Sequence, residues 1–569
     1  MAPKHHKYLY AIDFYFIIIY SMCVKFDIRF LPNYKDWRKS MIQLLPILLL
    51  SAFFIGCGQQ PYTNSQNTTK AKNVILLIAD GQSSDVITYS RWFNGGDSLA
   101  IDEMLSGAVR THNADSPIAD SAPAGTALAT GYKSSYQQFI GVFPDEAILP
   151  NSSIPTEARA PIANVLEAAQ LLGKSTGVIS TSEIMHATPA AFSAHDITRK
   201  DYDDLSEQQV FQDIDVILGG GYKFFTKEYR KDGKDLISEM TNLGYSIIRT
   251  SDELDSFRGD KVVGLFADAD LAYEIDREET TQPSLAQMTS KAIDILSKND
   301  KGFFLIVEAS KVDWAAHAND LVGLASDTLA YVDAVKAALD FAKKDNNTMV
   351  IAVTDHGNSG FTMGNYDTSS DYHKRKLESF IEPVKKASRS AEYVARKIEA
   401  GEDIRTAMQK YYAIDDMTEE EVNSLRGKTG DDLHYAIGPI LAKRAYLGFS
   451  THGHTGEDVP LYTYLPNNKR IVGLIDNTDI AKNIAFAMGI NLDEATKKLF
   501  MSEDELKKAG VELTSDGNIL TMHIGDKTAQ IMKNRNIIIV DGEKKTLDGV
   551  VVYNESKWYF PSQVLDILK

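Results

Sequence analysis

Hydrophobic residues in this chain form short continuous runs that alternate with helical periodicity from residue 73 onward. Val74–Ile78 consists of apolar residues only, a pattern typical of a central parallel strand that is covered on both faces. Similar runs predict further buried strands at Ser175–Ser180, Asp215–Leu218, Phe303–Val307 and Thr348–Val353.

Helical segments separate these strands. The pattern predicts helices at Ile162–Leu172, Ser284–Ser297 and Asp327–Lys344. In the last of them the apolar residues recur with a period of 3.6 and form one face. Alternating strands and helices of this kind predict an α/β fold with a doubly wound, mostly parallel sheet flanked by helices.

Polar residues follow four of the predicted strands at their carboxyl ends. They are Asp80, the segment Glu183 to Thr188, the segment Glu308 to His317, and the pair Asp355-His356. Ligand sites in open α/β sheets lie outside the carboxyl ends of the strands. We therefore expect these four groups to converge on one site.

Two segments depart from the alternating pattern. Residues 365–449 are polar and highly charged, with helical stretches at Glu378–Ala400 and Thr418–Leu425. We expect a mainly helical insertion, lying either over the site or as a solvated surface decoration. After it, Leu461–Leu465 and Ile471–Ile475 are predicted strands and Thr478–Met488 a predicted helix.

The last segment, residues 501–569, has the pattern of a small β-rich appendage to a main domain that spans residues 72–500. Trp558-Tyr559-Phe560 is expected to pack against it. The predicted elements are a helix at Glu503–Lys508 and short strands at Ile519–His523, Gln530–Met532, Asn536–Val540 and Val550–Tyr553.

The first 57 residues have the pattern of a leader. Leu44–Ile55 is an apolar segment preceded by Arg38 and Lys39, as in a signal peptide. Ile55-Gly56-Cys57 is similar to a lipobox, which predicts a lipid on Cys57, a tether over residues 58–71, and a membrane-anchored lipoprotein exported to the periplasm or cell surface. A secreted protein cleaved nearby is the alternative. Translation starting at or near Met41 would explain the unusual residues 1–40.

Charge and cysteine content restrict the chemistry. The chain of 569 residues has a formal net charge of −18, which argues against a nucleic acid partner because no basic stripe offsets phosphate repulsion. A bound metal could still attract a small anionic substrate. Both cysteines, Cys23 and Cys57, precede the main domain, so a metal there must be held by His, Asp, Glu and hydroxyl groups.

A candidate nucleophile lies in the segment Ala119–Thr126. Ser121 follows an acid and precedes small residues that predict the start of a helix. Backbone N–H groups and the helix dipole at such a position suit a phosphate-like substrate. The surroundings lack the Gly-x-Ser-x-Gly pattern of triad hydrolases, so Ser121 needs a metal or another base, or it is simply a helix cap.

Candidate metal ligands occur on one helical turn, at or directly after predicted strands, and in a glycine-containing segment. Asp313 and His317 are four residues apart and share one face of a helical turn. Asp355 and His356 follow a strand directly, His454 lies between glycines, and Glu308 places a carboxylate at a strand end. Each of these groups alone is only weak evidence for a metal site, but together they predict a metal centre.

These residues resemble the motifs of the alkaline phosphatase family, in the family's order and local spacing, from Lys72 to about Ile490. The matching blocks are Asp80-Gly81, Asp120-Ser121-Ala122, His186-Ala187-Thr188-Pro189-Ala190 followed by Arg199, Asp215–Gly221, Val307-Glu308 with Asp313 and His317, Thr354-Asp355-His356, and His454-Thr455-Gly456.

The resemblance implies an alkaline phosphatase-like catalytic domain with two Zn²⁺ ions and one Mg²⁺ ion. It implies one zinc on Asp313, His317 and His454, and a second on Asp80, Asp355 and His356 beside Ser121. It implies magnesium on Asp80, Thr188 and Glu308, and a phosphate clamp at Arg199. The implied reaction is hydrolysis of phosphate monoesters at alkaline pH through a phosphoserine, with release of inorganic phosphate. A homodimer is possible.

Two positions depart from well-known relatives. Trp314 stands where those relatives carry Lys or His near the phosphate, which predicts weaker phosphate and product binding. His186 stands where some have an acid beside magnesium, which makes the third metal the least certain. His112, His195, His452 and His523 are interpreted as loop or core residues.

Three other functions were weighed. A sulfatase is disfavoured because Gly125 replaces the arginine that its motif needs after Ser121-Ala122-Pro123-Ala124. A phosphodiesterase of the same superfamily remains the main alternative, although the Arg199 clamp favours a terminal phosphate. A catalytically inactive surface binding protein is disfavoured because every site position is intact.

Overall fold

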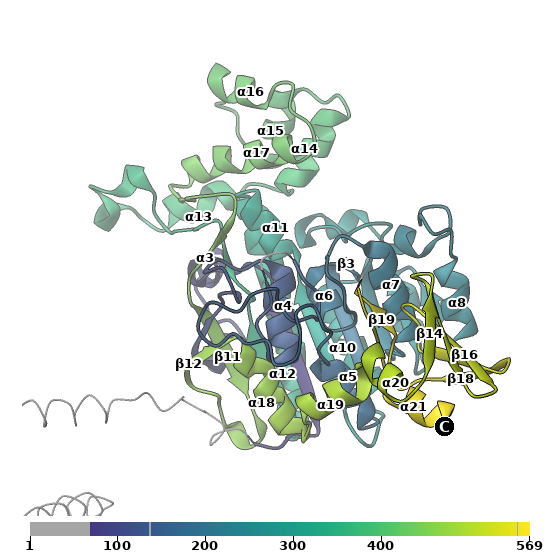
Figure 1. Cartoon of the computed structure of the whole chain (residues 1–569). Coiled ribbons are helices and arrows are strands. Elements are labelled where there is room, and N and C mark those ends of the chain that lie inside the picture. Colours follow the sequence, from purple (N-terminus) through teal and green to yellow (C-terminus); the bar gives the residue numbers. More distant parts are fainter. Residues whose placement is uncertain (1–68, 136–137, 555) are drawn as a thin grey trace, which may run out of the picture. The chain divides into compact units, whose positions relative to one another are not determined.

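The computed structural model describes residues 69–135, 138–554 and 556–569. Its centre is a ten-stranded sheet in the order β12-β2-β11-β8-β1-β7-β3-β4-β6-β5, with helices on both faces (Figure 1). The predicted signal peptide, Cys57 and most of the predicted tether lie outside the described residues. Within the described part of the chain, we find no helix that is both long and apolar enough to cross a membrane.

Seven neighbouring strands of this sheet are parallel, as the sequence predicts. They are β8 (Thr348–Val353), β1 (Asn73–Ala79), β7 (Phe303–Ala309), β3 (Ser175–Glu183), β4 (Val216–Gly220), β6 (Val262–Leu265) and β5 (Ser246–Ile248). On the other side, β11 (Val459–Tyr464) runs antiparallel to both β8 and β2 (Leu105–Arg110), and β12 (Gly473–Asp476) forms the edge.

Strand β1 is buried on both faces, because its alternate side chains enter two different cores. Ile75 and Leu77 pack against one layer of helices, whereas Val74 and Leu76 pack against the other. The first layer includes α3 (Ser84–Phe93), α10 (Leu285–Leu296) and α12 (Leu321–Asp345). The second includes α4 (Ser121–Thr130), α5 (Val165–Leu171) and α18 (Thr478–Met488).

Six further α-helices belong to the described part of the main domain. They are α6 (Ala187–Ala191), α7 (Tyr202–Phe211), α8 (Leu236–Asn242), α9 (Ser251–Ser256), α11 (Lys311–His317) and α19 (Leu492–Leu499). Helix α12 begins six residues before the predicted Asp327, because the side chain of Asp320 accepts a hydrogen bond from Val322 N and caps the helix there.

Strand register determines which polar residues meet. Ile78 of β1 is level with Glu308 of β7 on one side and with Val353 of β8 on the other. Asp80, the residue directly after β1, therefore lies between the polar segments that follow β7 and β8. Its amide donates to the carbonyl of Ala309. The site lies at this carboxyl edge.

The insertion, residues 365–449, is mainly helical as predicted. Its helices are α13 (Glu378–Lys385), α14 (Ala391–Glu399), α15 (Ile404–Tyr412), α16 (Glu419–Leu425) and α17 (Gly430–Arg444) (Figure 1). The predicted single stretch Glu378–Ala400 is wrong, because it contains two helices. Ser390 separates them: its hydroxyl caps α14 by accepting from Tyr393 N and donates to Asp276 of the main domain.

The C-terminal segment 501–569 contains an antiparallel five-stranded sheet and a three-stranded sheet. The first comprises β14 (Glu512–Ser515), β15 (Ile519–Ile524), β16 (Lys527–Met532), β17 (Ile537–Val540) and β18 (Glu543–Thr546). The second comprises β13 (Met501–Ser502), β19 (Val552–Tyr553) and β20 (Trp558–Phe560), beside α20 (Glu503–Lys508) and α21 (Gln563–Leu568). Trp558 packs into a core of this segment, as the sequence predicts.

Candidate metal centre and nucleophile

Ser121 is the first residue of α4. The side chain of Asp120 caps this helix by accepting a hydrogen bond from Ala122 N, which leaves Ser121 buried at the helix N-terminus. The hydroxyl of Ser121 lies 3.2 Å from Nε2 of His356, at the end of β8. The predicted helix start is confirmed, and it places the hydroxyl among the predicted metal ligands.

Asp313, His317 and His454 form one cluster of ligand atoms. Asp313 and His317 come from α11, and His454 comes from the two-residue strand β10 (His454–Thr455). His317 Nε2 is 3.2 Å from Asp313 Oδ2 and 3.2 Å from His454 Nε2. Two imidazole nitrogens and a carboxylate at these separations are a donor set that suits zinc.

The orientation of the three histidines is set by backbone carbonyl groups. His317 Nδ1 lies 2.5 Å from the carbonyl oxygen of His452, and His454 Nδ1 lies 2.7 Å from that of Ala119. His356 Nδ1 faces the carbonyl of Gly357 at 3.3 Å. When Nδ1 carries the proton, Nε2 has a free lone pair, which is the arrangement found for metal-binding histidines.

Asp80, Asp355 and His356 form the second cluster. His356 Nε2 lies 3.5 Å from Asp80 Oδ1 and 3.3 Å from Asp355 Oδ2. Asp355 Oδ1 accepts from the amides of Gly81 and His356, but both oxygens of Asp80 and the second oxygen of Asp355 are buried without a hydrogen-bond partner. Buried oxygens in this state need a cation or another donor.

The predicted third ligand set lies beside the second. One oxygen of Glu308 and the hydroxyl of Thr188 are also buried and unpartnered, whereas the other Glu308 oxygen accepts from Ser180 at 2.5 Å. These two groups and Asp80 offer only oxygen atoms, the ligands that magnesium prefers. The unpartnered oxygens therefore fit the predicted metal ions on observed geometry.

Mutual repulsion and burial perturb the carboxyl groups of the second and third ligand sets. Burial raises the pKa of Asp80 well above its ordinary value, and the charge of Asp355 raises it further. Burial likewise raises the pKa of Glu308 to about 7 and that of Asp355 to about 6. The protein alone does not neutralise these carboxylates, so bound cations would stabilise their ionised form.

The first cluster behaves differently because it pairs opposite charges. Burial by itself would lower the pKa of His317. The negative charge of Asp313 outweighs this effect and raises the pKa of His317 to about 9. In the same way His317 and then His454 hold the pKa of Asp313 well below its ordinary value despite burial. Asn358 donates to Asp313 Oδ1 at 2.6 Å and holds the carboxylate in place.

Arg199 lies in the turn before α7, beside the nucleophile. Its Nη1 donates to Asp120 Oδ1 at 2.5 Å, and its Nη2 lies 2.9 Å from His186 Nε2. Burial lowers the pKa of His186 to about 3, with the charge of Arg199 contributing, so His186 is a neutral acceptor. The guanidinium is thereby directed at the space in front of Ser121.

Gly81 allows the two clusters to approach each other. Its φ of +65° lies in the left-handed region, and a Cβ atom added here would lie 2.3 Å from Asp313 Oδ1. A side chain at this position would displace a predicted zinc ligand.

The site opens into a cavity of about 570 Å³ whose outer wall belongs to the insertion. Its inner part contains Ser121, Arg199 and the first cluster, and Trp314 packs edge-on against His186 with ring centroids 5.7 Å apart. Insertion residues complete the wall: Glu392, Asp431, His434 and Tyr435. The insertion therefore lies over the site rather than apart from it.

The structure brings all ten predicted site residues to this edge, namely Asp80, Ser121, Thr188, Arg199, Glu308, Asp313, His317, Asp355, His356 and His454. Sequence reasoning missed Ser180 and Asn358, which bond Glu308 and Asp313, and Lys311, which pairs with Asp270 and Glu392. Ser180 ends a predicted strand and Asn358 lies five residues after another, so polar side chains at strand ends could have indicated these two. His452 is not a ligand here; its ring stacks on Tyr435, and its carbonyl orients His317.

Comparisons with known proteins agree with this geometry. Residues 71–490 match the family model described as alkaline phosphatase. Alkaline phosphatase 4 of Bacillus subtilis (strain 168) is 39% identical over 477 residues, covering 80% of this chain and 97% of that protein. The cold-active alkaline phosphatase of Shewanella sp. is 30% identical with a TM-score of 0.63, covering 73% of this chain and 99% of that one.

A third relative is a variant of TAB5 alkaline phosphatase in which a histidine is replaced by aspartate, solved with Mg bound in its M3 site. It is 26% identical with a TM-score of 0.53, covering 74% of this chain and 99% of that one. The family match, the coverage of whole relatives and the shared fold lead to one conclusion: this chain belongs to the alkaline phosphatase family.

Proposed function

We propose that this hydrolase cleaves phosphate monoesters at alkaline pH through a phosphoserine on Ser121, with two Zn²⁺ ions and one Mg²⁺ ion bound. The observation that carries the proposal is the position of the Ser121 hydroxyl, 3.2 Å from His356 Nε2 in a group of unpartnered carboxylate oxygens. The Mg-containing TAB5 variant supports magnesium as one of the metals.

The donor atoms match this metal assignment. Asp313, His317 and His454 would hold one zinc. Asp80, Asp355 and His356 would hold the other. His356 also lies close to Asp313 and His454, so the two sites adjoin. Asp80, Thr188 and Glu308 would hold magnesium. When bound, these ions would lower the pKa of the Ser121 hydroxyl and offset charge on the phosphoryl and leaving oxygens.

The protein groups have separate tasks in the reaction. The Ser121 oxygen forms a bond to phosphorus while the bond from phosphorus to the ester oxygen breaks on the opposite side. Arg199 binds the equatorial oxygens, where negative charge is spread, and the positive end of the α4 dipole lies on the same side. Water then cleaves the phosphoserine, which releases inorganic phosphate and restores the hydroxyl.

Arg199 also favours monoesters over diesters. Its planar guanidinium has N–H groups besides those directed at Asp120 and His186, so it can donate to two free phosphate oxygens at once. A monoester has three free oxygens and a diester two. With one oxygen held at the proposed metal ions, a monoester leaves two for Arg199 and a diester only one. Diesterase activity is therefore the second candidate function.

Export also belongs to the proposal. Leu44–Ile55 and Cys57 support an exported, lipid-anchored protein on sequence grounds alone. Mass spectrometry of the mature N-terminus would find lipidated Cys57 if this is correct, and an unmodified peptide spanning residue 57 if it is not.

Hydrolysis of p-nitrophenyl phosphate tests the proposed reaction. Wild-type protein should hydrolyse it faster than bis-p-nitrophenyl phosphate, and a chelator should abolish the activity. Ser121→Ala should lower kcat/KM by about a thousandfold or more, because the nucleophile is lost. Ser116→Ala, whose hydroxyl donates to the carbonyl of Ile118, is the control and should retain activity. Preference for the diester, or full activity in Ser121→Ala, would contradict the proposal.

Metal uptake should depend on pH through His317. Below pH 9 the metal-free protein keeps His317 protonated beside Asp313, and a metal must displace that proton. Zinc affinity at the first cluster should therefore rise with pH up to about 9, by roughly tenfold per unit from this group. Calorimetry at pH 8 in buffers of different ionisation enthalpy should detect about one proton released at this cluster. Zinc binding there without proton release would refute this assignment.

A further inference from the structure

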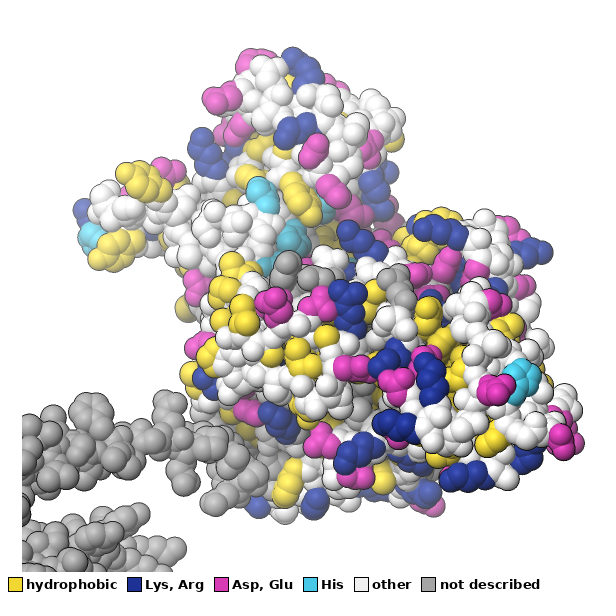
Figure 2. Space-filling view, in the orientation of Figure 1, with side chains coloured by type: hydrophobic (Ala, Val, Ile, Leu, Met, Phe, Trp, Pro, Cys, Tyr) yellow, Lys and Arg dark blue, Asp and Glu magenta, His cyan; other side chains and the backbone are white. Residues whose placement is uncertain are grey.

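The outer part of the catalytic cavity has a distinct chemical character. It is formed by α14 and α17 of the insertion and by the segment after β6, and Figure 2 shows histidine side chains gathered where the insertion meets the main domain. We call it the cavity mouth and define it by six residues: Asp270, Tyr273, Glu392, Asp431, His434 and Tyr435.

The cavity mouth carries excess negative charge. Lys311 is buried beneath it and pairs with Asp270 and, at 3.6 Å, with Glu392. Asp431 is exposed, and no partner for its carboxylate is found among the described residues. Glu392 also pairs with Arg396 at 3.6 Å. Three carboxylates against two cations leave one net negative charge at the opening, on Asp431, whereas Arg199 and the proposed metal ions lie deeper.

Aromatic rings form the other part of this wall. The Tyr435 ring is stacked on His452, with ring centroids 5.7 Å apart and planes 4° apart. The Trp314 ring lies over the Lys311 ammonium at 4.2 Å. Flat apolar surfaces beside His317 can pack against an organic group that leaves on the side opposite Ser121.

We propose that the cavity mouth is a leaving-group subsite that selects phosphate monoesters with uncharged or cationic leaving groups. It disfavours leaving groups with a further phosphate or carboxylate, because these approach Asp431 and its acidic neighbours with the same sign of charge. The inference rests on the proposed monoesterase function and names its substrate class.

A substrate series tests this subsite. In the wild type, kcat/KM for phosphocholine and phenyl phosphate should exceed that for 3-phosphoglycerate and fructose 1,6-bisphosphate at equal ionic strength. Asp431→Asn should raise kcat/KM for the two anionic-leaving-group substrates by about threefold, lower it for phosphocholine, and leave it unchanged for phenyl phosphate. The matched control is Asp432→Asn, an exposed neighbour outside the cavity lining, which should change none of them.

The possible results distinguish failure of the proposed monoesterase function from failure of the leaving-group subsite. If phenyl phosphate is not hydrolysed at all, the proposed function fails. If it is hydrolysed but Asp431→Asn changes all substrates equally or not at all, the subsite inference is wrong and the function stands.

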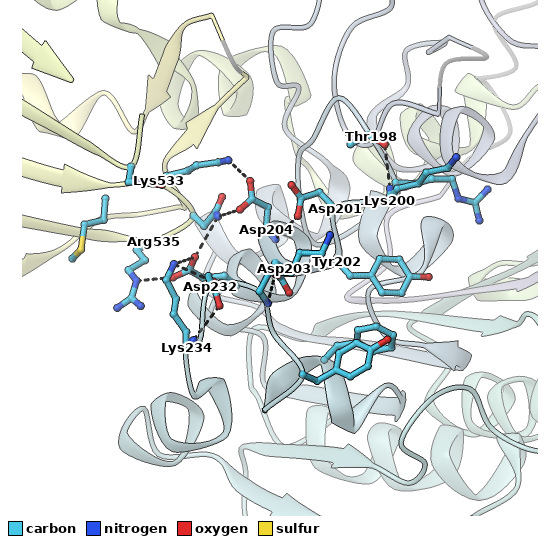
Figure 3. A pocket seen from close by; sticks show the side chains of 18 of the residues that line it. Thr198, Lys200, Asp201, Tyr202, Asp203, Asp204, Asp232, Lys234, Lys533 and Arg535 are labelled. Atoms are coloured by element: carbon cyan, nitrogen blue, oxygen red, sulfur yellow. Dashed lines mark hydrogen bonds and ion pairs between the residues drawn. The ribbon is translucent and has the colours of Figure 1, made fainter. Parts of the chain in front are cut away.

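A second observation concerns the C-terminal segment 501–569, which lies beyond the family match at residues 71–490. The turn between β16 and β17 presents Lys533, Asn534 and Arg535 to α7 of the main domain. These contacts lie in a groove of about 1350 Å³ (Figure 3). Arg199 also belongs to the lining of this groove.

Lys533 contacts an acidic group that flanks Arg199 in sequence. Carboxylate oxygens of Asp196, Asp201 and Asp204 lie within 4.8 Å of one another, on either side of the Arg199 turn. The Lys533 ammonium forms an ion pair with Asp204, and Figure 3 shows it directed at this carboxylate. Without this cation, three carboxylates would repel one another across the turn.

The neighbouring residues attach the same turn to α7. The Asn534 amide donates to Asp204 at 2.9 Å and accepts from Gln208 at 3.2 Å. Gln208 in turn bonds the backbone N–H and carbonyl of His195, four residues before Arg199. The C-terminal segment thus contacts the Arg199 segment in two ways. One is the ion pair of Lys533 with Asp204, and the other is the hydrogen bond of Asn534 with Gln208, which itself bonds the backbone of His195.

We infer that Lys533 is a positioning residue for the phosphate clamp: it offsets the charge of Asp204, reduces the repulsion within the acidic turn, and leaves the Arg199 guanidinium directed at Asp120 and the substrate phosphate. The segment 501–569 thereby contributes to phosphate binding without entering the catalytic cavity.

Inhibition by inorganic phosphate tests this role. Lys533→Gln should raise the inhibition constant for phosphate and the KM for p-nitrophenyl phosphate by about fivefold, with kcat changed by less than twofold. The matched control is Lys557→Gln, in the same segment, whose ammonium pairs with Glu157 and Asp504 away from Arg199. It should leave the inhibition constant unchanged.

A double variant distinguishes charge from general damage. Asp204→Asn combined with Lys533→Gln removes both members of the pair and should return the inhibition constant to within about twofold of wild type. Equal effects of the two lysine substitutions, or no effect of Lys533→Gln in a protein with wild-type Tm, would overturn the inference.

Discussion

The register of strand β1 between β7 and β8 is the constraint on which the site depends. It places Asp80 beside Asp355 and near Glu308, three buried carboxyl groups at one edge of the sheet. Burial raises the pKa of all three; the charge of Asp355 further raises the pKa of Asp80 and Glu308, and that of Asp313 the pKa of Asp355. Such an arrangement is unfavourable in the protein alone and becomes favourable with bound cations. The sheet therefore provides a rigid but electrostatically incomplete site.

The other parts of the molecule are arranged around this edge. Helix α4 places Ser121 beside the carboxylates, and α11, which follows β7, brings Asp313 and His317. The insertion closes the opening from above, and the C-terminal segment contacts the turn that carries Arg199. In the proposed reaction, each of these parts acts on a different part of the substrate: the reacting phosphorus, the leaving group or the equatorial oxygens.

Much of this could be predicted from sequence, because the informative patterns are local. Continuous apolar runs identified β1, β7 and β8, and polar residues directly after them identified the site edge. Helix caps were harder to recognise in the sequence. Glu378–Ala400 was predicted as one helical stretch, whereas Ser390 caps a second helix within it.

Long-range relations could not be read from the sequence. Lys311 looks like an ordinary surface lysine until the fold places Asp270 and Glu392 around it. Lys533 meets Asp204 across more than three hundred residues of chain, and no local pattern records that pairing. The register between β1, β7 and β8 is likewise a property of the assembled sheet. The family resemblance did imply its consequence, which is that Asp80, Glu308 and Asp355 lie close together.

We propose that the carboxyl edge of the sheet holds metal ions beside Ser121. Anomalous diffraction from crystals of the zinc-loaded protein, measured on both sides of the zinc absorption edge, would locate them. Two zinc peaks are expected, one among Asp313, His317 and His454 and one among Asp80, Asp355 and His356. Zinc peaks only elsewhere on the protein, or none in crystals of active enzyme, would contradict this proposal.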